Sequence, residues 1–99
     1  MANRIIKWDN EALAAFKAAM LYIRKRSYQN AEKVSAEIIS RIDKLAEHPE
    51  FWSPDKWKLN NEGEFRAFEL HRFRVSYQVK ETEIVIVRFR HTSQQPEDY

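Results

Sequence analysis

The sequence predicts an α+β domain in which two helices pack on one face of an antiparallel sheet. Two amphipathic helical patterns occupy the first half of the chain, and three strand patterns follow at close spacing in the second half. This order is typical of α+β folds rather than of alternating α/β folds. The 99 residues have room for a single domain, 1–99, which buries enough surface to fold without disulfide bonds.

Composition narrows the class of protein. The chain is 43% hydrophobic and 32% charged, too rich in core-forming residues for disorder and too charged for a membrane protein. It has no cysteine, so neither disulfides nor thiolate metal sites can form, and a reducing cytoplasm is the expected location. No apolar run is long enough for a signal peptide or a membrane span. We expect no membrane partner, no metal and no other cofactor.

The first helical pattern follows a short predicted strand at 4–8. Asp9 or Asn10 can cap the helix, which should run from about Glu11 to Arg26. Its apolar stripe recurs at helical spacing: Leu13, Phe16, Met20 and Ile23.

A second helix is predicted after the short link 27–29. Asn30 can cap it, and Pro49 should end it near His48. Its apolar stripe consists of Val34, Ile38, Ile42 and Leu45. Because the link is short, the two helices should be antiparallel, each turning an apolar stripe to a shared partner.

Three strands are predicted next, and a meander is the simplest way to connect them. They cover residues 65–70, 73–80 and 84–91. The preceding stretch 51–64 lacks periodicity and is predicted to be a loop, with Trp52 and Trp57 as its anchors.

The register of the last strand decides where its arginines lie. The middle strand alternates an apolar set, Phe73, Val75, Tyr77 and Val79, with a polar set, Arg74, Ser76 and Gln78. A three-residue loop at 81–83 joins Val85, Val87 and Phe89 to the apolar face and brings Arg88 and Arg90 beside Ser76 and Arg74. A two-residue loop would bury both arginines at a high energetic cost. We therefore predict an arginine cluster on the open face of the sheet.

The face occupied by Arg66 depends on the preceding turn. A two-residue turn at His71–Arg72 would place Arg66 on the core side, whereas an odd-length loop would bring it beside Arg74. The sequence leaves both arrangements open.

Several segments together resemble a known family. They are Gly63-Glu64-Phe65-Arg66, Phe73-Arg74-Val75-Ser76-Tyr77, the strand Ile84-Val85-Ile86-Val87-Arg88, and His91 near the end. In this combination the chain resembles the RelE/ParE superfamily of type II toxins over nearly its whole length. The resemblance implies a growth-inhibiting toxin, as in plasmid stabilisation, that a cognate antitoxin neutralises. RelE-like members cut mRNA on the ribosome without a metal, whereas ParE-like members poison DNA gyrase and lack the nuclease residues.

For a RelE-like nuclease the resemblance assigns candidate catalytic residues. Arg74 would bind the scissile phosphate, and Arg66 would add a second phosphate contact. His91 would transfer a proton, and Tyr99 would transfer a proton or stack on a base. The structural alternatives are a solvent-facing arginine, a histidine that caps a strand end and a frayed terminal tyrosine. Candidate RNA-binding residues are Arg88, Arg90, Lys56 and Lys58. For the two loop lysines the structural alternative is a solvated side chain, as most loop lysines are.

One departure from the nuclease pattern concerns the segment before the final tyrosine. RelE-like nucleases carry a further basic residue there, whereas this chain has Thr92-Ser93-Gln94-Gln95. The leading hypothesis is a metal-independent, ribosome-associated mRNA endoribonuclease. The alternatives are a non-catalytic, ParE-like inhibitor of DNA gyrase and a degenerate member that only binds its antitoxin.

Overall fold

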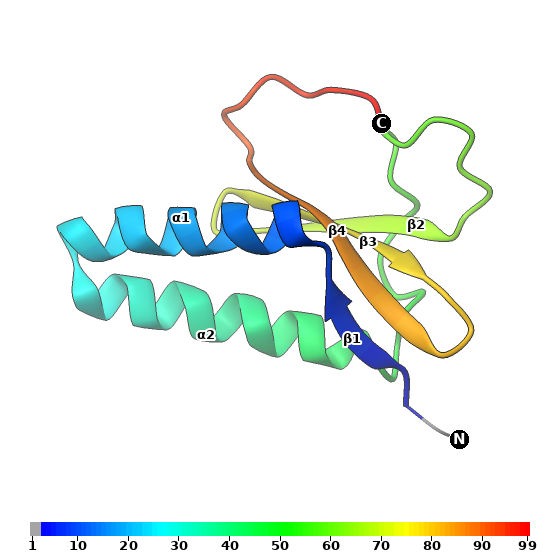
Figure 1. Cartoon of the computed structure of the whole chain (residues 1–99), viewed down its shortest axis with the longest axis horizontal. Coiled ribbons are helices and arrows are strands. Elements are labelled where there is room, and N and C mark those ends of the chain that lie inside the picture. Colours follow the sequence, from blue (N-terminus) through cyan, green and yellow to red (C-terminus); the bar gives the residue numbers. More distant parts are fainter. Residues whose placement is uncertain (1–2) are drawn as a thin grey trace.

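The computed structural model describes residues 3–99 as a strand, two helices and three further strands (Figure 1). The elements are β1 (Ile5–Trp8), α1 (Asn10–Arg26), α2 (Tyr28–Lys44), β2 (Phe65–Leu70), β3 (Phe73–Val79) and β4 (Glu83–His91). The strand order in the sheet is β1-β4-β3-β2, with β1 parallel to β4 and the other pairs antiparallel. The predicted α+β class is confirmed. No helix in the described part of the chain is long and apolar enough to cross a membrane.

Helix capping explains where the hairpin turns. The Asp9 carboxylate accepts hydrogen bonds from the backbone N–H groups of Glu11 and Ala12, so Asp9 caps α1. Ser27 ends α1 and caps α2, because its hydroxyl accepts from the N–H of Asn30 at 3.1 Å. The predicted cap at Asn30 is therefore wrong. Ser27, a single residue in extended conformation, reverses the chain direction between the helices. α2 therefore begins at Tyr28, two residues before Asn30.

The core lies between the helix pair and one face of the sheet. Its large, fully buried side chains come from α2 and its C-cap, from β3 and from β4: Ile38, Ile42, Leu45, Val75, Tyr77, Ile84 and Ile86. Phe16 of α1 packs edge-on against Phe89 at a ring separation of 5.2 Å. Each fully buried aliphatic or aromatic side chain stabilises the fold by roughly 1.5–3 kcal/mol, which neither helix can obtain alone.

The turn between β2 and β3 decides the position of Arg66. His71 and Arg72 have φ values of 53° and 67°, as a two-residue type I′ turn requires. Leu70 pairs with Phe73, and Arg66 pairs with Tyr77. Arg66 thus belongs to the helix-side face of the sheet, which is the first of the two arrangements that the sequence left open.

The hairpin between β3 and β4 differs from the prediction in two features, a shorter loop and a β-bulge, whose effects on the register cancel beyond the bulge. Lys80 N–H donates to the Glu83 carbonyl at 2.9 Å, which leaves a two-residue loop. A register shift at Ser76/Tyr77 then inserts Val87 as a β-bulge. Ile84 and Ile86 therefore face the core, and the predicted core positions of Val85 and Val87 are wrong.

The bulge also restores the predicted position of the arginines. Beyond it, Arg88 pairs with Ser76, and Arg90 pairs with Arg74. Without the extra residue, a two-residue loop would have turned both arginines towards the core.

The long segment after α2 covers the outer edge of β2. α2 ends at Lys44, four residues before the predicted end, and the Tyr77 hydroxyl donates to the Pro49 carbonyl at 2.8 Å. Trp52 packs on Phe68 at 5.6 Å and anchors the loop as predicted. Pro54 forms an isolated bridge with Arg66, so the loop protects an edge strand that would otherwise offer free backbone groups.

Candidate functional site

The open face of the sheet carries a polar cluster around a pocket of about 180 Å³. The cluster, called here the open-face cluster, consists of Asp55, Arg74, Ser76, Arg88, Arg90 and Tyr99. Four strand residues, Arg74, Ser76, Arg88 and Arg90, lie beside one another through the β3–β4 register. The loop and the C-terminal tail bring Asp55 and Tyr99 to them. The predicted arginine cluster on this face is therefore present.

Asp55 is the centre of the cluster. Its side chain is 0% exposed, and one oxygen accepts a hydrogen bond from the Arg74 guanidinium at 2.8 Å. The other oxygen accepts from the Tyr99 hydroxyl at 2.7 Å. The backbone N–H of Trp57 donates to Asp55 as well, at 3.1 Å. A buried carboxylate needs this many partners, because an unpaired one would ionise only at great cost.

These partners keep Asp55 ionised. Burial alone would raise the pKa of Asp55, but the hydrogen bonds from Arg74, Tyr99 and Trp57 outweigh it and lower the pKa below 3.8. Arg74 is further held by Glu69 at 2.9 Å. Its Nε atom is buried without a partner among the described residues. The guanidinium of Arg74 is thus already shared by two carboxylates.

Tyr99 is ordered against the loop rather than frayed. Its backbone N–H donates to the Trp57 carbonyl at 3.0 Å, and its ring lies edge-on to Phe65. Burial, followed by the hydrogen bond to Asp55, raises the pKa of the Tyr99 hydroxyl well above 10. At neutral pH this hydroxyl is a hydrogen-bond donor.

The tail that precedes Tyr99 holds the two β4 arginines. Arg88 donates to the Glu97 carbonyl at 2.8 Å, and its guanidinium stacks 4.3 Å from the Tyr99 ring centre. Arg90 donates to the Gln95 carbonyl at 2.9 Å. All three arginines of the open-face cluster therefore have partners within the chain.

His91 lines the pocket from the end of β4. Its Nδ1 atom accepts the backbone N–H of Ser93 at 3.0 Å and lies 2.6 Å from the Ser93 hydroxyl. The ring is edge-on to Phe73, which is its register partner. These contacts fit a histidine that closes a strand end, which was the structural alternative for this residue.

The remaining predicted site residues separate into two groups. Lys56 lines the pocket beside Trp57, and Lys58 donates to the backbone carbonyl of Tyr99 at 3.3 Å. Arg66 instead donates to the carbonyls of Gly63 and Trp52 at 3.1 Å and 2.7 Å. Arg66 fastens the loop on the helix side of the sheet, so the structure does not bring it to the open-face cluster.

Sequence reasoning missed Asp55, the residue with most contacts in the cluster. It lies in the aperiodic loop, where a single aspartate after Pro54 gives no signal of burial. Glu97 was missed for the same reason, because a tail residue acquires a role only when the tail crosses the sheet. Within residues 3–99, no group of three or more His, Cys, Asp or Glu residues is arranged to hold a metal ion.

Comparisons with solved structures bear on the fold. The chromosomal ParDE toxin–antitoxin system from P. aeruginosa contains a chain with a TM-score of 0.70 and 20% identity, covering 89% of this chain and 95% of that one. A free-state variant of the E. coli toxin RelE, with two arginines replaced by alanine, gives a TM-score of 0.59 at 18% identity, covering 92% and 84%. The fold is therefore that of RelE/ParE superfamily toxins. No curated protein sequence matches the chain.

The family follows from the sequence match. The family described as the ParE toxin of the type II toxin-antitoxin system, parDE, matches residues 6–96. The chain belongs to this family and is a toxin of a type II toxin-antitoxin system. Membership implies a cognate antitoxin as its partner.

Proposed function

We propose that this toxin acts as a ParE-like inhibitor of DNA gyrase and does not cut RNA. The observation that supports the proposal best is the buried carboxylate of Asp55 at the centre of the open-face cluster. A phosphate bound by Arg74 would lie next to this carboxylate. Two like charges about 4 Å apart near a protein surface repel by roughly 4 kcal/mol.

Tyr99 and His91, which would move protons in a nuclease, each have a hydrogen-bond partner within the chain. The Tyr99 hydroxyl donates to Asp55, and its raised pKa keeps it protonated at neutral pH, so it is a poor general base. The Nδ1 atom of His91 accepts from Ser93. The segment 92–95 carries no basic residue. These features suit a toxin that acts by binding a protein.

The test is inducible expression without antitoxin, followed by primer extension on cellular mRNA and a test for DNA damage. We expect growth arrest with intact mRNA, together with DNA damage. Cuts inside translated codons that disappear in Arg74→Ala or His91→Ala would overturn the proposal.

A metal-independent, ribosome-associated endoribonuclease is the second candidate. It is favoured by the pocket that brings Arg74, Arg88, Arg90 and His91 to one place. For this activity the tail must leave the arginines, and Asp55→Asn should then increase cleavage by removing a repelling charge. Unchanged mRNA in cells that express Asp55→Asn, at a protein level equal to wild type, would argue against it.

A third possibility is a degenerate family member that binds antitoxin and has lost toxicity. It predicts normal growth on expression while the antitoxin complex still forms. Growth arrest by the wild-type chain excludes it.

A further inference from the structure

The turn between α1 and α2 carries an uneven distribution of charge. None of the 20 residues between Glu11 and Glu32 is acidic, whereas four are basic: Lys17, Arg24, Lys25 and Arg26. The net charge of the whole chain is only +2. Three of these four basic residues, Arg24, Lys25 and Arg26, form the last turn of α1, directly before the turn to α2.

Exposed apolar side chains gather at the same turn. Leu21, Tyr22 and Tyr28 are 54%, 62% and 55% exposed. They are three of the six exposed large hydrophobic side chains in the described part of the chain. Residues 21–28, called here the hairpin tip, project beyond the sheet along the longest axis of the molecule (Figure 1).

Helix stability explains only part of this arrangement. Cations in the last turn of a helix interact favourably with its dipole, which accounts for Arg24, Lys25 and Arg26. It does not account for three large apolar side chains that contribute nothing to the core. Tyrosine and arginine together are instead typical of the residues that dominate protein–protein contacts.

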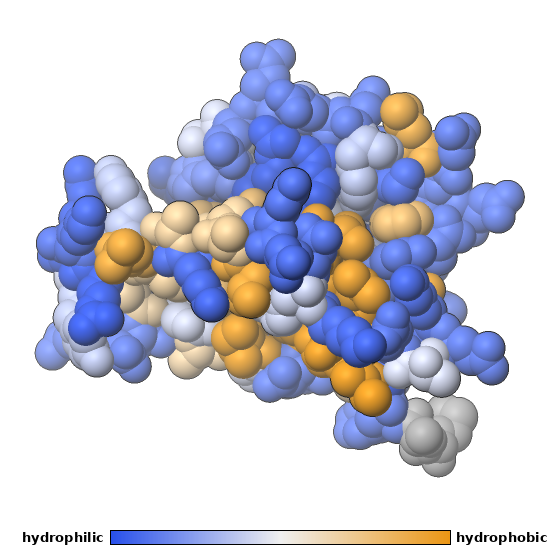
Figure 2. All heavy atoms as spheres, viewed as in Figure 1, coloured by the Kyte–Doolittle hydropathy of each residue, from blue (hydrophilic) through white to orange (hydrophobic). Residues whose placement is uncertain are grey.

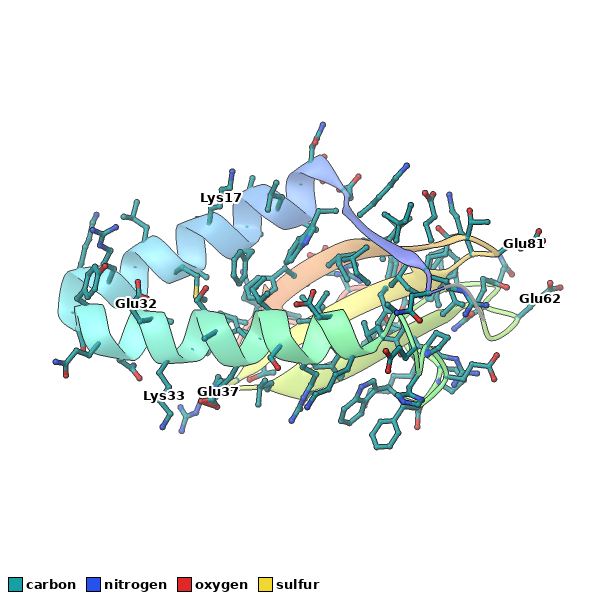
Figure 3. All side chains as sticks on the ribbon, turned by 90° about the horizontal axis from the view of Figure 1, so that it is seen from below. Lys17, Glu32, Lys33, Glu37, Glu62 and Glu81 are labelled. Atoms are coloured by element: carbon teal, nitrogen blue, oxygen red, sulfur yellow. The ribbon has the colours of Figure 1, made fainter. Side chains whose placement is uncertain are left out.

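A hollow of about 260 Å³ adjoins the hairpin tip in the seam between the helices. Its apolar lining is Phe16, Met20, Leu21 and Ala31, and Lys17 and Arg24 supply positive charge. Glu32 lies on the side of α2 that faces α1 (Figure 3). In Figure 2 apolar side chains follow this seam, while hydrophilic ones crowd the end of the hairpin. The hollow can take one apolar side chain inside a mostly positive rim.

We propose that the hairpin tip and the adjoining hollow bind the toxin's protein target, through a segment that presents an apolar side chain among acidic residues. This inference rests on the proposed function, in which the toxin acts by binding a protein. The positive rim steers an acidic surface into contact, and the apolar side chain enters the hollow. Binding of this kind weakens as the ionic strength rises.

A nucleic acid is a poorer occupant of this surface. Arg24 lies 4.8 Å from the ring centre of Tyr28, and Arg26 lies 5.4 Å from that of Tyr22. Each tyrosine ring thus has one face covered by a guanidinium, which restricts the stacking that single-stranded nucleic acids need. A nucleic acid also offers no aliphatic side chain for the hollow.

The experiment compares matched variants for growth arrest after induction, at equal protein levels. Leu21→Ser and Lys25→Glu alter the hairpin tip. Leu59→Ser is the control for Leu21, because Leu59 is 53% exposed elsewhere on the surface, and Lys44→Glu changes the corresponding last turn of α2. We expect the double variant of the tip to need about tenfold more toxin for the same arrest, the effect of losing one strong contact. The double control should match wild type.

Further results decide between the explanations. Both double variants should bind the antitoxin and melt like wild type, which excludes misfolding. Equal toxicity of tip and control variants would overturn the proposal, as would loss of antitoxin binding with toxicity retained. Retained toxicity of wild type with active gyrase would contradict the proposed target while leaving the hairpin tip supported by its variants. A nucleic acid that protects residues 21–28 from modification, where a protein target does not, would also overturn it.

Discussion

The two faces of the sheet are stabilised in different ways. On the helix side, apolar side chains such as Val75, Tyr77 and Ile86 are fully buried in a continuous core. On the open side, a buried carboxylate, three arginines and a tyrosine are held by hydrogen bonds to a loop and a tail. The first face depends on packing volume and the second on charge pairing. Substitutions should therefore affect the two faces through different mechanisms.

The largest effect is expected from a cavity on the helix side. Ile86→Ala removes a side chain that is 0% exposed, so the free energy of unfolding should fall by about 3–4 kcal/mol in urea titrations. Val85→Ala, one residue away on the open side, is the control and should cost less than about 1.5 kcal/mol. An equal loss of unfolding free energy in Ile86→Ala and Val85→Ala would contradict the assignment of Ile86 to the core face and Val85 to the open face.

Breaking the ion pair should give the next largest effect. Arg74→Ala leaves the Asp55 carboxylate buried without its main partner, and we expect a loss of about 2–3 kcal/mol, allowing for the partial exposure of Arg74. The double variant Arg74→Ala/Asp55→Asn should recover part of the loss, because the unpaired charge is gone. If the two substitutions are strictly additive in urea unfolding, Asp55 and Arg74 are not coupled.

Removing one hydroxyl should have a smaller effect. Tyr99→Phe deletes the hydrogen bond to Asp55 and keeps the ring beside Arg88, so a loss of about 1–2 kcal/mol is expected. Tyr28→Phe, whose side chain is exposed, should change stability by less than about 0.5 kcal/mol. Tyr99→Phe should also lose less stability than wild type at alkaline pH. The raised pKa of Tyr99 means that its contribution is complete below pH 10 and is lost as the pH rises towards the folded-state pKa.

Acid should remove the contribution of Asp55. Its pKa in the folded protein lies below 3.8, so its stabilising effect is complete above that pH and is lost as the pH falls through the lower, folded-state pKa. The free energy of unfolding, measured between pH 7 and pH 2, should therefore fall less in Asp55→Asn than in wild type. Identical pH profiles would show that Asp55 is not held by the cluster.

The same contrast explains what the sequence could predict. The core face follows from period-two alternation in β3 and helical spacing in α2, which are local patterns, and both were predicted correctly. The β-bulge at Val87 was not, because an apolar residue in an apolar strand gives no sign that it is unpaired. The prediction lacked the bulge but had a loop one residue too long. The two errors cancel, so Arg88 and Arg90 were still predicted on the correct face.

The open-face cluster could be predicted only in part. Arg74, Arg88 and Arg90 lie on regular strands, so their face follows from register once the hairpin is known. Asp55 and Tyr99 are 44 residues apart and meet through irregular segments. Local patterns contain no information on such a contact. The residue that argues most strongly against the nuclease hypothesis was therefore invisible in the sequence.

The most direct test of the central claim uses the purified toxin in two reactions at equal concentrations: DNA supercoiling by gyrase, and mRNA on translating ribosomes. We expect inhibited supercoiling and uncut mRNA, because the three arginines of the open-face cluster already have partners within the chain. Ribosome-dependent cleavage with unaffected supercoiling would contradict the claim and return Arg74, His91 and Tyr99 to catalytic roles.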